Sequence, residues 1–387
     1  MWFFSSPRIV FGEGALASLE TLEGRCACIV TDNNLARLGF VDRVRGALAS
    51  TGIEIAVIDN VEPDPSLETV KSGAERMLEI KPDLIIALGG GSVMDAAKGM
   101  WILYEHPDYD PEAINPIDKI SLRVKARLIA IPTTAGTGSE TTWAIVLTNH
   151  AEQRKLGLGN REAIPDIAIL DPEIIRDLPA RITAETGLDA LTHAIEGFTS
   201  IYANDFCDGL CLQATRLVFD YLPRCYHDGH DMDARAHMQN AASIAGLGFG
   251  NSMAALAHGM GHALGGALHV PHGRAVSIFL PYTIEYCAHR SGTRYAIIAR
   301  FLGLAAGSEE EAAANLVEAI RKLEQEVEQP LTLSEAGIER EVFDRELEHL
   351  IANALNDSQT IMATRIPEEA DMRRLFTCAF NGEKVDF

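Results

Sequence analysis

The chain has 387 residues, of which 47% are hydrophobic and 6% aromatic, as in an ordinary soluble globular protein. This length exceeds what one compact core usually serves and fits two domains. A net charge of −22, from 33 Lys and Arg against 55 Asp and Glu, opposes binding to nucleic acid or to an anionic membrane surface.

Cysteine usage and apolar runs indicate the compartment. The seven cysteines are scattered without a Cys-x-x-Cys pair, which is typical of buried thiols in a reducing environment. The start, MWFFSSPRIVFG, has no basic segment followed by a long apolar one, and no later stretch approaches ~18 consecutive apolar residues. We therefore expect a cytoplasmic protein without a membrane span, and we also expect a homo-oligomer.

The N-terminal half alternates segments typical of strands and of helices. Helices are expected at 41–50 and 67–79. Strands are expected at 3–11, 26–31, 54–58, 84–88, 127–132 and 167–172. Such alternation predicts an α/β domain with a largely parallel sheet covered on both faces.

A glycine-rich turn follows one of these strands, where LIIAL at 84–88 runs into GGGSVMDAAKG. Glycines let the backbone approach an anion, and Ser92 with Asp95 three residues on resembles a capping box that opens the next helix. The free amides and positive dipole of that helix suit a pyrophosphate. Because the segment is not a GxGxxG turn, a tight turn before a capped helix is the alternative.

A second polar loop, TTAGTGSETT, follows the strand RLIAIP. It offers hydroxyls to phosphate or ribose from Thr133, Thr134, Thr137 and Ser139. Two such loops after consecutive strands predict a dinucleotide at the carboxyl end of the sheet. Asp32, at the end of an earlier strand, is placed to accept from ribose hydroxyls and to repel a 2′-phosphate. The alternatives are a polar turn for the loop and a helix N-cap for Asp32.

The chain changes character from Leu178 onward. Long helices follow one another without an evident strand, and breaks are expected at Pro223, Pro271, Pro281 and Pro330. The sequence therefore predicts an α/β dinucleotide-binding domain over 1–177 and an all-helical domain over 178–387.

Two helical segments of the second half carry clustered ionisable side chains. Asp189 and His193 are four apart in ETGLDALTHAIEGF, so they share a helical face. His258 and His262 do the same in AHGMGHALGGALHVPHG. Glu196, one turn beyond His193, is either a partner of a metal ligand or a solvated surface residue.

The same stretch continues to His269 and His272 on either side of Pro271, which is expected to end the helix. A single histidine of this kind is usually a satisfied core or surface residue. So many ionisable groups would be costly to bury unpaired among apolar residues. A divalent metal is therefore predicted, Fe, Zn, Mn or Ni rather than Ca or Mg.

Together, GGGSVMDAAK, IPTTAGTGSETT, DALTHAIE and AHGMGHALGG with PHG resemble the iron-containing, group III alcohol dehydrogenase family, over almost the entire chain. The resemblance implies a dinucleotide-binding domain and a helical metal domain with the active site between them. It implies the metal ligands Asp189, His193, His258 and His272, and it places His262 beside the nicotinamide. The cofactor contacts that it implies are Asp32, Gly90, Gly91, Ser92, Thr133, Thr137, Val146 and Lys155. One departure is Asp64, where the family typically has Asn.

The resulting hypothesis is an oxidoreductase that uses NAD rather than NADP and interconverts a small alcohol and its aldehyde or ketone. A divalent metal, Fe²⁺ or Zn²⁺, would polarise the oxygen. His262 is expected either to pass the alcohol proton to solvent or to pack against the cofactor. The competing hypotheses are a carbon–oxygen lyase of the dehydroquinate synthase type and a non-catalytic nucleotide-binding protein.

Overall fold

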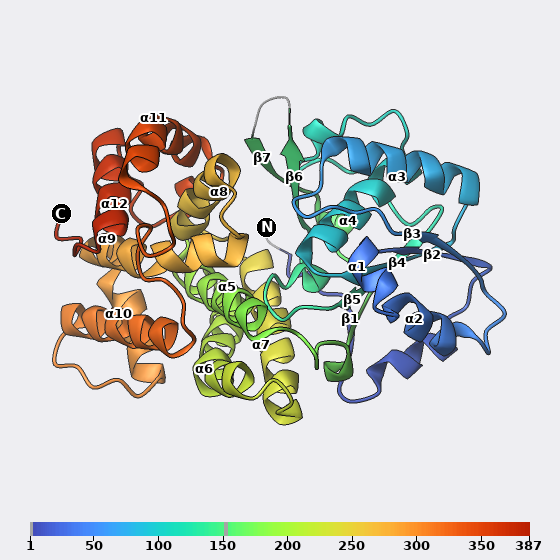
Figure 1. The fold of residues 1–387 in the computed structure, drawn as a ribbon, viewed down its shortest axis with the longest axis horizontal. Coiled ribbons are helices and arrows are strands. Elements are labelled where there is room, and N and C mark those ends of the chain that lie inside the picture. The colour runs from blue at the N-terminus through green and yellow to red at the C-terminus, as the bar shows by residue number, and fades with distance from the viewer. Residues whose placement is uncertain (1–2, 151–153) are drawn as a thin grey trace. The chain divides into compact units, whose positions relative to one another are not determined.

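The computed structural model describes residues 3–150 and 154–387 of the chain. Internal contacts divide the chain into two compact units, Met1–Asp177 and Leu178–Phe387. The first unit is built on a parallel sheet and the second is helical over its described residues (Figure 1). The predicted fold class, an α/β N-terminal half and an all-helical C-terminal half, is therefore confirmed.

Six parallel strands form the sheet of the first unit, in the order β1-β8-β5-β4-β2-β3. They are β1 (Arg8–Phe11), β2 (Cys26–Val30), β3 (Glu54–Ile58), β4 (Leu84–Gly89), β5 (Arg127–Pro132) and β8 (Ile167–Leu170). Every residue of β4 is buried, which is typical of a parallel strand covered on both faces.

Successive side chains of the central strands point to opposite faces of the sheet. Ile85 and Ala87 of β4 pack in one core with α3 (Leu67–Ile80) and α4 (Gly91–Glu105). Ile86 and Leu88 pack in a second core with the short helix η1 (Ala15–Thr21) and with α2 (Phe40–Leu48). The sheet is thus covered on both sides, as Figure 1 shows for α3 and α2.

The order of the strands changes direction beside β2. The chain runs from β2 to its neighbour β3 and then returns to pair β4 with the other side of β2. Ligands of open parallel sheets bind beyond the carboxyl ends of the strands at such a point. The short helix α1 (Asn33–Arg37) follows β2 there, and α4 follows β4.

An antiparallel hairpin of β6 (Ala144–Asn149) and β7 (Arg154–Gly159) stands apart from the main sheet. It was not predicted from the sequence. Buried and partly buried residues alternate along β6, which is the period expected of a strand with one covered face. The hairpin carries two of the expected cofactor contacts, Val146 and Lys155.

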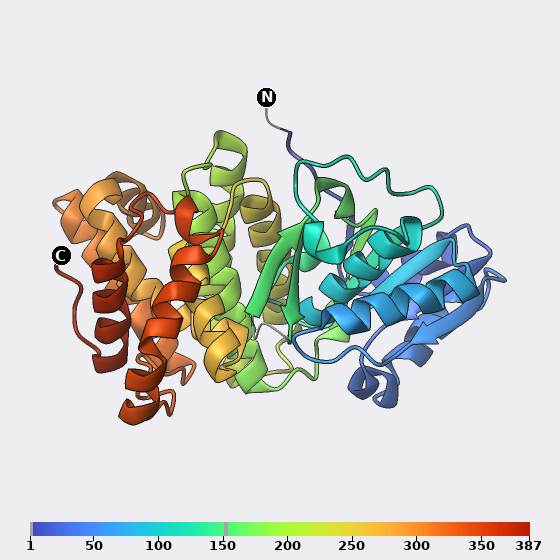
Figure 2. The same cartoon turned by 90° about the horizontal axis from the view of Figure 1, so that it is seen from above.

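The second unit contains helices α5 to α12. These are α5 (Ala180–Thr199), α6 (Asp205–His227), α7 (Met232–Gly250), α8 (Leu256–Leu268), α9 (His272–Phe301), α10 (Glu309–Glu326), α11 (Arg340–Asn356) and α12 (Glu369–Asn381). Helix α5 packs against α6, α7 and α9 (Figure 2). Its residues from Leu188 to Thr199 are all buried. No strand occurs between Leu178 and Phe387, a range that the structure describes completely.

Two of the four predicted helix breaks are wrong. Pro223 lies inside α6 and Pro281 lies inside α9. A proline in a helix removes one backbone hydrogen bond and costs about 3 kcal/mol. At Pro281, burial of the two adjacent side chains offsets that cost, because Leu280 and Tyr282 are each 1% exposed. The other breaks are confirmed, since Pro271 precedes α9 and Pro330 lies between α10 and α11.

The cysteines and the lengths of the helices can be compared with the expectations from the sequence. All seven cysteines are free thiols, and six of them are buried as predicted, whereas Cys26 at the start of β2 is only partly buried. Across the described residues, the helices are too short or too polar for a bilayer span.

Candidate metal and cofactor sites

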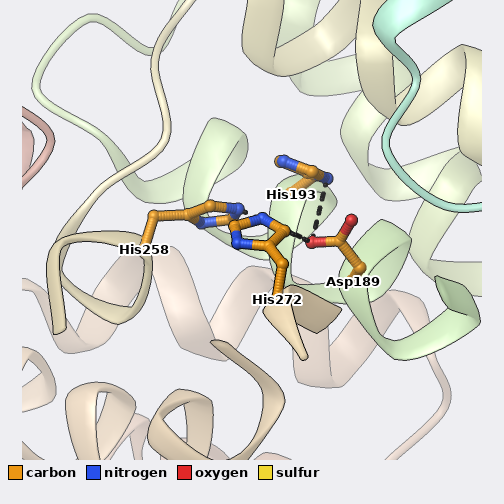
Figure 3. A group of neighbouring side chains, drawn as sticks. All are labelled: Asp189, His193, His258 and His272. Carbon is orange, nitrogen blue, oxygen red and sulfur yellow. Dashed lines mark ion pairs between the residues drawn. The ribbon is translucent and has the colours of Figure 1, made fainter. Parts of the chain in front are cut away.

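Four side chains of the helical unit converge on one point. Asp189 and His193 extend from α5, His258 from α8, and His272 is the first residue of α9. Figure 3 shows the carboxylate and the three imidazole rings pointing toward one another. One ligand atom from each residue lies within 4.8 Å of all the others.

The four ligand atoms lie close enough together to share one ion. Asp189 Oδ1 lies 3.6 Å from His193 Nδ1, 3.7 Å from His258 Nε2 and 3.6 Å from His272 Nε2. These separations are too long for hydrogen bonds. Asp189 is therefore spaced as a ligand of an ion shared with the three histidines, and not as their hydrogen-bond partner.

The environment of the four side chains favours a positive charge. Asp189 Oδ1 and His258 Nε2 are buried and lack a hydrogen-bond partner among the described residues. Burial raises the pKa of Asp189, but the three imidazoles outweigh it and hold that pKa well below its usual range. Burial lowers the pKa of His258, but the carboxylates of Asp189 and Glu196 raise it to about 9. A divalent ion fits this site, and its binding would release the proton of His258.

Close packing of α9 on α5 brings His272 to Asp189. A Cβ atom on Gly273 would lie 2.2 Å from the backbone oxygen of Glu185, so only glycine fits there. The guanidinium of Arg274 donates to the Glu185 carboxylate at 2.8 Å and ties the start of α9 to α5. His272 keeps its side chain 29% exposed, whereas Asp189, one turn beyond Glu185, is 1% exposed. The group is thus buried on the α5 side and accessible at His272.

Glu196 holds His258 in place. Its carboxylate accepts from His258 Nδ1 at 2.6 Å and from the backbone amides of Ala255 at 2.8 Å and Ala257 at 2.6 Å. Because Nδ1 is engaged, Nε2 is the nitrogen that faces Asp189. Glu196 is 4% exposed, so it is a partner of a candidate ligand and not a solvated surface residue.

His262 lies beside the four side chains but is not one of them. Its ring stacks on that of His272 with 5.4 Å between the ring centroids. Its Nδ1 donates to Asp357 Oδ2 at 2.9 Å, across 95 residues of chain. Asp357 directly follows α11 and was not identified from the sequence, because no local spacing links it to a histidine of α8.

The expected cofactor contacts lie at the carboxyl edge of the sheet in the first unit. Gly90 and Gly91 open α4, and the loop after β5 packs on them. A Cβ atom on Gly91 would lie 2.7 Å from the methyl group of Thr137, and one on Gly90 would lie 3.4 Å from Thr134. Thr133 donates its backbone amide to Gly89 at 3.0 Å. The two loops predicted to hold phosphates are therefore adjacent.

The capping box predicted from Ser92 and Asp95 is wrong. Gly90 is the N-cap of α4 with an extended backbone, Ser92 already lies within the helix, and no side chain caps this end. Asp95 instead accepts from Ser139 Oγ at 2.8 Å and from the amide of Val146 at 2.9 Å. The hydroxyl of Ser139 also accepts from the buried ammonium of Lys98 at 2.7 Å. Asp95 and Ser139 thus join α4 to the loop and the hairpin.

Two further charged residues at this edge already have protein partners. Asp32 caps α1 by accepting from the amide of Leu35 at 2.9 Å, which is the structural alternative recognised for it in the sequence. Lys155 of β7 donates to Asp64 Oδ1 at 2.7 Å.

Known proteins resemble both units. Residues 6–172 match the model of the iron-containing alcohol dehydrogenases, and residues 183–380 match that of the C-terminal part of the Fe-containing alcohol dehydrogenase family. The chain is 40% identical to an NADPH-dependent butanol dehydrogenase of Clostridium saccharobutylicum, covering 100% of both. It is 37% identical to a bifunctional aldehyde-alcohol dehydrogenase of Escherichia coli strain K12, with 99% of this chain aligned to 46% of the relative. The structure of a 1,3-propanediol oxidoreductase matches with a TM-score of 0.92 and 32% identity, covering 98% of this chain and 100% of the other.

Proposed function

This chain belongs to the iron-containing alcohol dehydrogenase family, and we propose that Asp189, His193, His258 and His272 hold the divalent metal with which it interconverts a small alcohol and its aldehyde or ketone. The observation that carries this proposal is the convergence of one buried carboxylate and three imidazoles, whose ligand atoms lie within 4.8 Å of one another. Imidazole and carboxylate ligands suit Fe²⁺, the metal of the family name, and also Zn²⁺.

Each residue near the metal ligands has a distinct task in this proposal. The metal, when bound, polarises the alcohol or carbonyl oxygen. Glu196 keeps Nε2 of His258 directed at the site through its bond to Nδ1. His262, oriented by Asp357, is placed to pass the alcohol proton toward solvent or to pack against the nicotinamide.

The dinucleotide is proposed to bind at the carboxyl edge of the sheet. Amides at the start of α4, beside Gly90, Gly91 and Ser92, would accept the pyrophosphate because a helix N-terminus favours anions. Hydroxyls of Thr133, Thr134 and Thr137, with Val146 and Lys155, would line the remaining path. The relative from C. saccharobutylicum is named as NADPH-dependent. We nevertheless propose NAD for this chain, because the carboxylate of Asp32 stands at the end of β2.

The two alternatives to a dehydrogenase are the carbon–oxygen lyase and the non-catalytic nucleotide-binding protein. The family models and the relatives described above are dehydrogenases and oxidoreductases, and they give no support to the lyase. A non-catalytic role conflicts with the complete set of four candidate ligands. The cytoplasmic location, for which the free thiols are the support, and the homo-oligomer remain predictions.

The proposal is tested by measuring turnover and metal together. The protein is purified without oxygen, its metal is quantified, and NADH and NADPH oxidation is followed with a panel of small aldehydes and oxo acids. We expect oxidation of NADH that falls when a chelator removes the metal and returns with Fe²⁺ or Zn²⁺. Full turnover of the metal-free protein would refute the metal site, and absence of turnover with every carbonyl compound would refute the proposed reaction.

A further inference from the structure

The amino ends of three adjacent strands carry two arginines on one face of the sheet. Strand β8 lies between β1 and β5. Its Ile167 pairs with Arg8 of β1 on one side and with Ile129 of β5 on the other. Arg127 begins β5 two residues before Ile129, so its side chain points to the same face as that of Ile129. The register therefore places Arg8 and Arg127 on one face and at the same end of the sheet.

The short helix η1 covers this face, because its Leu16 and Leu19 pack in one core with Ile129. Next to the helix and the strand ends lies a cavity of about 150 Å³. Its lining includes the apolar side chains of Val10, Ile167 and Ile169 and the polar side chains of Arg8, Ser18 and Arg127. A cavity of this volume admits a molecule about the size of benzene. It is therefore large enough for a small ion or metabolite and too small for a dinucleotide.

The polar side chains of this cavity have hydrogen-bonding groups to spare. Ser18 Oγ is buried and has no hydrogen-bond partner among the described residues. Arg127 donates to the backbone oxygen of Glu23 at 2.9 Å. Within residues 3–150 and 154–387, neither Arg8 nor Arg127 forms an ion pair with a carboxylate, although the chain has 55 Asp and Glu against 33 Lys and Arg. The cavity thus offers two positive charges and a hydroxyl to an anion.

We propose that this cavity binds a small anion that carries a phosphate group. A guanidinium presents its N–H donors in a planar fork that matches the oxygens of a phosphate. A phosphate group has enough oxygens to accept from Arg8, Arg127 and Ser18 together, whereas a carboxylate has only two. Strand β5 has six residues, so the cavity lies roughly 16 Å from the carboxyl edge where the dinucleotide is proposed to bind. The anion site is therefore separate from that edge and independent of the proposed function.

The main experiment measures the binding of inorganic phosphate by calorimetry in the unchanged protein and in Arg127→Gln. We expect Kd for phosphate to rise by about tenfold in the variant, because a charge-assisted hydrogen bond is lost. Arg45→Gln is the control. It removes the same charge from α2, which covers the same face of the sheet, and Arg45 pairs there with Asp42 at 3.1 Å. Kd for phosphate should stay unchanged in this control.

A second variant, Ser18→Ala, tests the cavity without changing any charge. It removes a hydroxyl that has no partner in the protein, so the thermal midpoint without phosphate should stay the same. Kd for phosphate should rise by about three- to tenfold, because the hydrogen bond from this hydroxyl to the anion is lost. In the unchanged protein, phosphate should raise the thermal midpoint, since an anion that binds only the folded state stabilises it.

Two further titrations identify the ligand and the place where it binds. Glycerol phosphate is compared with inorganic phosphate, and tighter binding of either one supports the proposal and identifies its source as an organic ester or the free ion. Succinate that binds as tightly as phosphate would overturn the assignment to a phosphate group. Kd for NADH should be the same in Arg127→Gln as in the unchanged protein, because the two sites lie at opposite ends of the strands. A parallel rise in Kd for NADH would place the phosphate in the dinucleotide site and overturn the inference. An unchanged Kd for phosphate in both Arg127→Gln and Ser18→Ala, or no phosphate binding at all, would overturn it as well.

Discussion

In the helical unit, three of the four candidate metal ligands are at most 5% exposed and come from helices packed on their neighbours. At the sheet edge of the first unit, the candidate cofactor contacts belong to loops and helix starts, and the carboxylate of Asp64 is 53% exposed. Attraction and repulsion between charges are several times stronger in a buried site than in one open to water. Single changes should therefore have large effects among the helices and small, graded effects at the sheet edge.

The largest effect is expected from His258→Ala. This change removes a nitrogen ligand and leaves the buried carboxylate of Glu196 without its partner. We expect metal content measured by elemental analysis to fall markedly, and turnover to fall by more than about 100-fold. His230→Ala, at an exposed turn residue of the same unit, is the control. Full metal occupancy with wild-type turnover would show that the ligand assignment is wrong.

A smaller effect is expected from Glu196→Gln, which changes the partner of a ligand rather than a ligand. The amide keeps the size of the side chain but loses the charge that orients His258 and attracts a cation. Metal affinity, measured by competition with a chelator, should fall by about 10- to 100-fold. Glu318→Gln, at an exposed position of α10, should have no effect. Unchanged affinity in Glu196→Gln would mean that packing alone positions His258.

His262→Phe separates the two hypotheses for that residue. If His262 relays the proton, the variant should keep its metal and its fold, lose turnover by about 100-fold and change the pH profile of kcat. Loss of metal together with activity would instead place His262 among the ligands. Full activity with an unchanged pH profile would leave it a packing residue. Asp357→Asn should shift turnover in the same direction by a smaller factor, because it weakens the bond to Nδ1.

Glu324 is a buried carboxylate of the helical unit whose expected effect is on stability rather than on activity. Its two carboxylate oxygens are buried in α10 and lack hydrogen-bond partners among the described residues. Burial raises the pKa of Glu324 well above its usual value, although Arg321 opposes the shift. Above a pH of about 4.5, the carboxyl group of Glu324 loses its proton in the unfolded chain but keeps it in the folded protein. Glu324 therefore lowers the free energy of unfolding by more as the pH rises.

Glu324→Met should consequently raise the free energy of unfolding by about 1–3 kcal/mol at pH 7 and by less at pH 4. Urea titrations at the two pH values measure the difference. Glu326→Met, two residues on and exposed, is the control. An equal gain at both pH values would show that the pKa of Glu324 is the same in the folded and the unfolded protein.

The smallest effect is expected at the sheet edge, in Asp32→Gly. Removing the carboxylate should raise the efficiency with NADPH relative to NADH by about tenfold, because a 2′-phosphate no longer meets a like charge. Asp32→Asn keeps a side chain that caps α1 and separates the charge from the cap. A ratio of kcat/KM values that stays constant in both variants would leave Asp32 with its capping role alone.

Much of this molecule is readable from local patterns. Buried parallel strands are continuous apolar runs, as in β4, and the helical period of 3.6 residues is enough to put Asp189 and His193 on one face. The glycine-rich turn and the threonine loop were identified because each directly follows such a strand. These features depend on residues close together in the chain, and their motifs sufficed to indicate the family.

Other features depend on which elements meet, and no local pattern encodes that. Asp95 was assigned to a capping box by its spacing, but the packing of the hairpin on α4 gives its carboxylate to Ser139 and Val146. Asp357 reaches His262 across 95 residues only because the end of α11 packs on α8. The burial of Glu196 and the ion pair of Asp64 with Lys155 arise in the same way. The sequence by itself determined the helix faces and turns that carry the functional side chains. Tertiary packing decided which partner each charged side chain has, because a buried charge without a partner lowers the stability of the fold.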